Sequence, residues 1–232
     1  MSKAGMGLGI VGIVLVGAAL AGPWWTFSMS GNVLLLSFNM TLGFGVFGGS
    51  ASGTLPGGGG LLTSGNYADM PATGGVFQLG MLLAVLGMVL GVVTLAASAM
   101  GGARPGLRRV GALMGVVGFV FVLLAAMYVM ANLPAAIATD TQSFGGVASF
   151  TGFWGSQSID IGGIQFATSW GAGWGWYLLI IGGVFLLIAG LASLRAPRPA
   201  PMMPAPGYAP GYPGYPMPPQ QAPPPPPPYQ QP

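Results

Sequence analysis

Residues 110–131 read VGALMGVVGFVFVLLAAMYVMA, an apolar stretch without a single charged side chain. Its length matches the roughly 20 residues that a helix needs to cross the hydrocarbon core of a bilayer. Lipid offers the backbone no hydrogen-bond partner, so a stretch of this kind must be helical inside a membrane. We therefore predict that residues 110–131 form a transmembrane helix.

Three further stretches have the same character. Residues 4–25, 76–99 and 174–194 are also long enough to span a bilayer and contain no Asp, Lys or Arg. The whole chain is 53% hydrophobic and only 4% charged, whereas a soluble domain carries about 25% charged residues. The sequence therefore predicts an all-α transmembrane four-helix bundle in a multi-pass protein of the cell membrane.

The cations fall on one side of this four-span arrangement. All six Lys and Arg precede the first span, separate the second from the third, or follow the fourth: Lys3, Arg104, Arg108, Arg109, Arg195 and Arg198. Such residues are enriched on the cytoplasmic side of membrane proteins. We therefore expect both termini to be cytoplasmic and residues 26–75 and 132–173 to be extracytoplasmic loops.

The first span admits a second interpretation. Ala19-Leu20-Ala21 before Gly22, behind Lys3 and an apolar run, resembles the cleavage site of a signal peptide. The run is longer than the apolar region of most signal peptides, and Pro23-Trp24-Trp25 follow at once. We expect residues 1–21 to be retained, and cleavage would leave the orientation of the other three spans unchanged.

Aromatic side chains gather at the outer ends of the spans. Trp and Tyr are enriched where a membrane protein meets the lipid headgroups. We predict interfacial anchors at Trp24, Trp25, Trp174, Trp176 and Tyr177. The alternative is that these rings stack on a ligand.

Small residues recur four positions apart in the spans, for example at Gly87/Gly91 and Gly111/Gly115. Helices in lipid associate where small residues let their backbones approach. We expect these faces to hold the bundle together within one chain. The alternative is that they bind a second copy of the chain or another membrane protein.

The outer loops carry the alternating pattern of half-buried strands. In residues 37–44, one face would hold four apolar side chains: Phe38, Met40, Leu42 and Phe44. We expect residues 27–30 to pair with this strand through a turn at Gly31-Asn32. Residues 159–166 read as a hairpin with its turn at Gly162-Gly163.

These strands are expected to form one small extracytoplasmic sheet that caps the bundle. The Gly-rich segment 43–60 between them is predicted to be mobile. Asn39, in Asn39-Met40-Thr41, is a candidate glycosylation site because the triplet fits the acceptor pattern.

The composition changes after residue 195, and most of the 22 prolines lie in residues 197–232. Proline cannot support helix or sheet hydrogen bonding, so we predict a membrane domain at 1–195 and a disordered cytoplasmic tail at 196–232. Pro226-Pro227-Pro228-Tyr229 fits the pattern that WW-type grooves bind. A polyproline-binding cytoplasmic partner is one hypothesis, and an inert solvated tail is the other.

The ionisable residues argue against an enzyme. The chain has no Cys and no His, and all three of its acidic residues are Asp: Asp69, Asp140 and Asp160. Acid–base catalysis and metal binding depend mainly on the missing residue types, so we expect no catalytic residue, cofactor or metal site. A net charge of +3 on so few cations also gives no surface for nucleic acid.

The remaining hypothesis is a non-catalytic membrane-organising or accessory protein, with outer loops that contact a partner and a tail that recruits cytoplasmic factors. The alternative is a small-solute channel or transporter subunit. The two can be distinguished by the small polar residues of the spans, chiefly Gln78, Thr94 and Ser98. A continuous wet path lined by them would favour transport.

Four spans with both ends inside, and an outer sheet drawn from two loops, resemble the claudin-type tetraspan architecture. The chain departs from it because Trp24-Trp25 follow the first helix directly and paired loop cysteines are missing. The Gly-Tyr-Pro tail resembles synaptophysin-type tetraspans in organisation. Most of the segment 1–195 is similar to uncharacterised prokaryotic, often archaeal, four-span proteins with Pro-Trp-Trp after the first helix. These resemblances imply a tetraspan fold and bring no activity.

Overall fold

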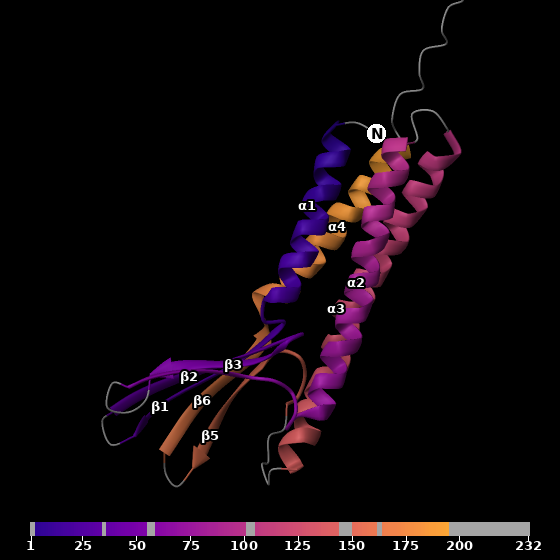
Figure 1. Ribbon diagram of the computed structural model, residues 1–232. Coiled ribbons are helices and arrows are strands. Elements are labelled where there is room, and N and C mark those ends of the chain that lie inside the picture. The colour runs from indigo at the N-terminus through magenta and orange to yellow at the C-terminus, as the bar shows by residue number, and fades with distance from the viewer. Residues whose placement is uncertain are drawn as a thin grey trace, which may run out of the picture. The chain divides into compact units, whose positions relative to one another are not determined.

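Figure 1 shows the computed structural model of the chain. The structure describes residues 3–33, 36–54, 59–100, 105–143, 150–161 and 164–194. The chain divides into two units, Met1–Ala196 and Pro197–Pro232, and all described residues belong to the first. The tail, with its candidate motif at residues 226–229, lies outside the described residues.

Four helices make up the larger part of the described structure. They are α1 (Lys3–Ala21), α2 (Pro71–Met100), α3 (Pro105–Ser143) and α4 (Trp174–Leu194). Each is long and apolar enough to cross a membrane, which confirms the four predicted spans of a multi-pass membrane protein. The first helix ends before the predicted residue 25, because Pro23 disfavours helical backbone at Gly22 and Trp25 begins a strand.

Helices α2 and α3 continue past the end of α1. Helix α1 has 19 residues and α3 has 39, which correspond to about 28 Å and about 58 Å of helix. A Cβ atom on Gly80 of α2 would lie 2.7 Å from Val129 of α3 and 3.1 Å from Trp24, which follows α1. Residues 71–79 and 130–143 therefore extend beyond the level at which α1 ends.

This extension corrects the predicted loop at 132–173. Its first part is helical through Ser143, with Pro134 inside the helix. The sequence alone does not show this part of the helix, because Pro134 and several polar side chains lower the hydropathy by which a membrane span is identified. Leu133 and Ile137 are nevertheless buried, and this packing stabilises the helix where composition alone would end it.

Helix packing depends on glycine. Helix α1 lies beside α4, and α2 lies beside α3, as Figure 1 shows. A Cβ atom on Gly115 of α3 would lie 2.8 Å from the Cα of Gly190 in α4, and one on Gly87 would lie 2.8 Å from the carbonyl oxygen of Gly118. The close contacts predicted for the small residues thus occur within the chain.

The two long loops together form one six-stranded antiparallel sheet. The first loop contributes β1 (Trp25–Val33), β2 (Leu36–Gly45), β3 (Gly48–Thr54) and β4 (Gly60–Gly65), and the second contributes β5 (Gly155–Ile161) and β6 (Ile164–Ala172). The strand order is β4-β3-β2-β1-β6-β5. The single sheet drawn from both loops is confirmed, but the fold is a bundle with a substantial sheet rather than all-α.

The predicted strand at 37–44 is confirmed by β2, and the strand pairing predicted within 159–166 by that of Ile161 with Ile164. The predicted turn at Gly162-Gly163 lies outside the described residues. The predicted turn at Gly31-Asn32 is wrong, because these residues pair with Phe38 and Ser37 inside the β1–β2 ladder. The apolar alternation of β2 identified the strand but could not show how far its partner continues.

The prediction that residues 43–60 are mobile is also wrong for β3. This strand reads GGSASGT, a composition typical of linkers. It is paired on both sides, to β2 and to β4. Backbone hydrogen bonds therefore hold this strand in place, although its side chains show no strand pattern. Gly48 begins it with a φ of 149°, which only glycine adopts readily.

Candidate functional site

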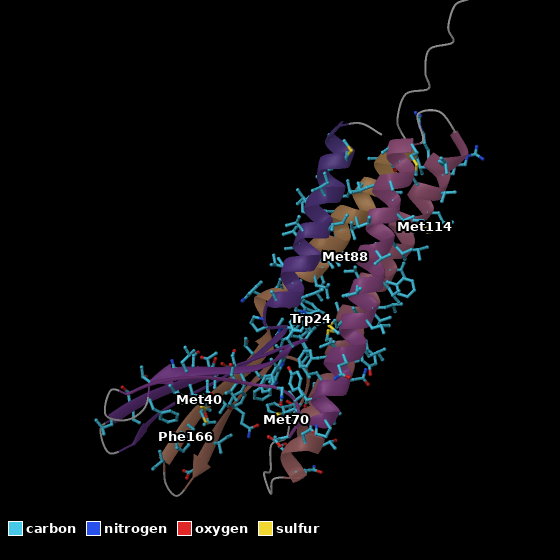
Figure 2. All side chains as sticks on the ribbon, in the orientation of Figure 1. Trp24, Met40, Met70, Met88, Met114 and Phe166 are labelled. Atoms are coloured by element: carbon cyan, nitrogen blue, oxygen red, sulfur yellow. The ribbon has the colours of Figure 1, made fainter. Side chains whose placement is uncertain are left out.

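The sheet is joined to the helices by a buried set of rings that we call the aromatic junction. Its members are Trp24, Trp25, Phe44, Phe77, Phe153, Trp170 and Trp176. The rings of Trp24 and Phe77 meet edge to face at 6.4 Å, and those of Trp25 and Phe44 lie 5.6 Å apart. Figure 2 shows Trp24 between the sheet and the helices.

The indole N–H groups of the junction are satisfied inside the protein. Trp24 donates to the carbonyl of Ala19 at 2.7 Å and Trp25 to that of Phe153 at 2.9 Å. Trp176 of α4 donates to the carbonyl of Ala126, in the middle of α3, at 3.2 Å. These bonds hold the Trp24 ring against the end of α1, join β1 to the second loop and join α4 to α3.

The junction corrects part of the predicted anchoring set. Trp24, Trp25 and Trp176 are at most 8% exposed, so their rings are enclosed by protein and have no surface for lipid headgroups. Trp174 and Tyr177, at 52% and 49%, keep the exposure that an interfacial anchor needs. For these two residues anchoring stays a prediction.

Tyr67 ties the β2–β3 turn to α2. Its ring stacks on Phe77 with centroids 5.5 Å apart, and its hydroxyl donates to the carbonyl of Gly45 at 2.6 Å. Burial raises the pKa of the Tyr67 hydroxyl well above its ordinary value, and the bond to Gly45 opposes only part of this rise. The hydroxyl therefore remains a proton donor throughout the physiological pH range.

Asp140 of α3 caps the start of α2. Asp140 is 4% exposed, and its carboxylate accepts hydrogen bonds from the backbone N–H of Ala72, at 3.1 Å, and of Thr73, at 2.7 Å. Pro71, the first residue of α2, has no N–H, and Gly74 donates to the carbonyl of Met70. Asp140 therefore completes the hydrogen bonding of the first turn of α2 and stabilises its positive end.

One face of the sheet is apolar. The pairing places Trp25 beside Phe44 and Phe27 beside both Leu42 and Trp170 on this face. Phe150 covers its inner part, with ring centroids 5.4 Å from Trp25 and 5.2 Å from Trp170. The inner half of the face is thus part of the aromatic junction.

The outer half of the same face is only half-buried. We call it the distal strip, formed by Phe38, Met40 and Phe166. Phe38 and Phe166 lie 5.4 Å apart on either side of Gly31, which has no side chain to separate them. Figure 2 shows Met40 and Phe166 near each other at this end of the sheet. Of the four apolar side chains predicted on the buried face of β2, only Phe44, at the inner end, is therefore fully buried.

The opposite face of the sheet is covered with hydroxyls and amides, and we call it the polar face. Its members include Thr26, Ser28, Ser30, Asn39, Thr41, Ser50, Ser52, Ser64, Ser158 and Ser169. Ser28 and Thr41 lie within hydrogen-bond distance, 3.5 Å. Asn39, the candidate glycosylation site, is exposed on this face, and its modification stays a prediction.

Of the small polar residues of the spans, Thr94 and Ser98 lie about one turn apart on α2, and Gln78 lies away from both. Thr94 and Ser98 are buried, and a Cβ atom on Gly111 of α3 would lie 2.8 Å from the Ser98 hydroxyl. Thr94 donates to the carbonyl of Leu90 at 2.8 Å. Gln78 is exposed on the part of α2 that extends past α1. Within the described residues these three side chains do not line one path.

Sequence reasoning missed the roles of Tyr67, Asp140 and Phe150. Pro71 was a usable signal for the start of α2, because proline is favoured at the first position of a helix.

Within the described ranges, no three His, Cys, Asp or Glu side chains gather into a group that could hold a metal. Comparison with known proteins gave no match, either among family models or among curated proteins.

Proposed function

We propose that this chain is a non-catalytic membrane-organising or accessory protein that presents its sheet to a partner outside the cytoplasm. The observation that supports this proposal best is the distal strip, an aromatic patch that the chain leaves half exposed. Exposed apolar patches with polar surroundings are typical of protein–protein contact sites. The resemblance to claudin-type tetraspans is part of the same proposal.

The proposed orientation places both termini in the cytoplasm. Lys3 begins α1, Arg108 and Arg109 lie in the first turns of α3, and the sheet follows the other ends of these helices. Positive side chains favour the cytoplasmic side. The aromatic junction fixes the sheet to the helices, so a partner bound at the distal strip would be held at a defined position above the membrane.

A channel or transporter subunit is the second candidate. Thr94 and Ser98 are enclosed at the contact of α2 with α3, so a solute path would have to form between copies of the chain. The cytoplasmic tail at 196–232, with its Pro-Pro-x-Tyr motif, would recruit soluble factors in either case.

The partner contact predicts a strong effect of Phe166→Asp. Removing a large apolar contact costs about 2 kcal/mol, which is more than tenfold in affinity, and a carboxylate adds a desolvation cost. We expect a detergent pull-down, read by mass spectrometry, to lose at least one outer-side membrane protein. Ser30→Asp, on the polar face of the adjacent strand, is the matched control and should leave recovery unchanged.

A chain lacking residues 200–232 should lose only cytoplasmic factors in the same experiment. Equal protein lists for Phe166→Asp and Ser30→Asp would contradict the proposed contact. An identical list for the full-length and truncated chains would contradict recruitment by the tail.

A further inference from the structure

The end of α1 marks the headgroup level of the bilayer. Its 19 residues span about 28 Å, whereas the hydrocarbon core is about 30 Å thick. The helix therefore has no residue to spare, and Gly22 and Pro23 are expected at the membrane surface. The half-exposed Trp174 ring packs directly on Gly22, as expected for an interfacial side chain.

The β2–β3 turn is held at this same level. The backbone N–H of Trp24 donates to the carbonyl of Phe44 at 2.7 Å, and a Cβ atom on Gly45 would lie 2.8 Å from the carbonyl oxygen of Gly22. Phe47, at the tip of the turn, is 72% exposed. An aromatic ring of this exposure at headgroup depth is placed to enter the interface rather than water.

A cavity of about 510 Å³ lies between the end of α1 and the polar face of the sheet. Leu20 and Ala21 line it from α1, and Gly43, Ser50 and Ser64 form one cross-strand row along its floor. A Cβ atom on Gly43 would lie 3.1 Å from the Ser50 hydroxyl and 3.3 Å from Pro23. Glycine at this position therefore keeps the cavity open toward α1.

The polar groups of this cavity differ between its two sides. Ser50, Ser64 and Asn66 offer hydroxyl and amide donors, while the last carbonyls of α1 form the negative end of a helix. None of the lining side chains is ionisable. A site of this kind cannot neutralise a net charge, but it can accommodate a group that carries a phosphate and an ammonium together.

We propose that this cavity binds the zwitterionic headgroup of a phospholipid in the leaflet next to the sheet, with Phe47 inserted beside it. The phosphate lies against Ser50, Ser64 and Asn66, and the ammonium lies against the carbonyl end of α1. The proposal concerns the polar face and the bilayer, so it is independent of the partner contact at the distal strip.

The depth of Phe47 can be measured with a fluorophore. The chain contains no Cys, so Phe47→Cys gives a single site for an environment-sensitive dye. Leu36→Cys is the control, because Leu36 is also exposed but lies at the other end of β2. In phosphatidylcholine vesicles with nitroxide at the headgroup, the dye at 47 should be blue-shifted and quenched, and the dye at 36 should be neither. Equal emission and quenching at the two positions would overturn the insertion.

Headgroup binding is tested by filling the cavity. Ser50→Phe places a ring in it, and Ser169→Phe makes the same change at an exposed position of the polar face outside it. Protein purified from mixed phosphatidylethanolamine and phosphatidylglycerol membranes should retain phosphatidylethanolamine, detected by native mass spectrometry, and only Ser50→Phe should lose it. Equal retention by both variants, or retention of phosphatidylglycerol instead, would overturn the proposal. Partner recovery in the pull-down should be unchanged by Ser50→Phe.

Discussion

Replacing Gly115 by leucine is expected to prevent the bundle from assembling. A Cβ atom at this position would lie 2.8 Å from the Cα of Gly190 and 3.3 Å from the carbonyl oxygen of Leu186, and both are backbone atoms of α4. Backbone cannot move aside as a flexible side chain does, so α3 and α4 must separate along their contact. Overpacking of this kind costs about 3 kcal/mol or more, and lipid provides no hydrophobic force to restore the contact.

The measurement is the yield and melting temperature of detergent-solubilised protein by size-exclusion chromatography. Gly7→Leu is the control, because no atom outside the helix lies within 4 Å of a Cβ atom on Gly7, which is exposed on α1. It should behave as the unaltered chain. If Gly115→Leu melted as Gly7→Leu does, the packing of α3 against α4 would be wrong.

Replacing Asp140 by alanine is expected to release the start of α2 from the end of α3. The buried carboxylate accepts two backbone hydrogen bonds, from Ala72 and Thr73. Its loss leaves both donors without this partner and removes a negative charge from the positive end of a helix, which we expect to cost about 2 kcal/mol. The melting temperature should fall clearly, and hydrogen exchange should increase in residues 71–77.

Asp69→Ala provides the control for this change. Asp69 is exposed in the turn before α2, so its removal should alter the melting temperature little. Asp140→Asn keeps one side-chain oxygen and should recover part of the loss. If Asp140→Ala and Asp69→Ala were equally stable, the cap would not contribute to the fold.

The transmembrane helices could be predicted because lipid imposes a simple requirement. A stretch such as residues 110–131 must be apolar over its whole length and must satisfy its own backbone, so composition alone identifies it. Strand β2 was visible for a similar reason, since Phe38 to Phe44 alternate between an apolar and a polar face. Both signals are local and repeat along the chain.

Features that depend on distant partners could not be predicted in this way. Strand β3 is held by backbone pairing to β2 and β4, and nothing in its Gly- and Ser-rich sequence indicates those partners. Trp24 and Trp25 follow a span, as lipid-facing anchors do, but the fold of the second loop buries Trp25 against Phe153. Asp140 became a cap only because α3 continues far enough to reach Ala72.

The central claim is that the sheet and the connection between α2 and α3 lie on opposite sides of a membrane. It is tested most directly by single cysteines and a membrane-impermeant maleimide in intact cells. Ser52 and Ser158 are exposed on the sheet, and a Cβ atom on Gly106, at the start of α3, has no atom of another element within 4 Å. Gly53 and Gly155 of the sheet are unsuitable for a cysteine label, because a side chain at 53 would clash with the backbone of Asn39 and one at 155 with the ring of Trp170.

Ser52→Cys and Ser158→Cys should be labelled in intact cells, and Gly106→Cys should be labelled only after the membrane is permeabilised. Labelling at 106 with none at 52 and 158 would contradict the orientation. Labelling of all three positions in intact cells would contradict the claim that the chain spans the membrane with its sheet on one side.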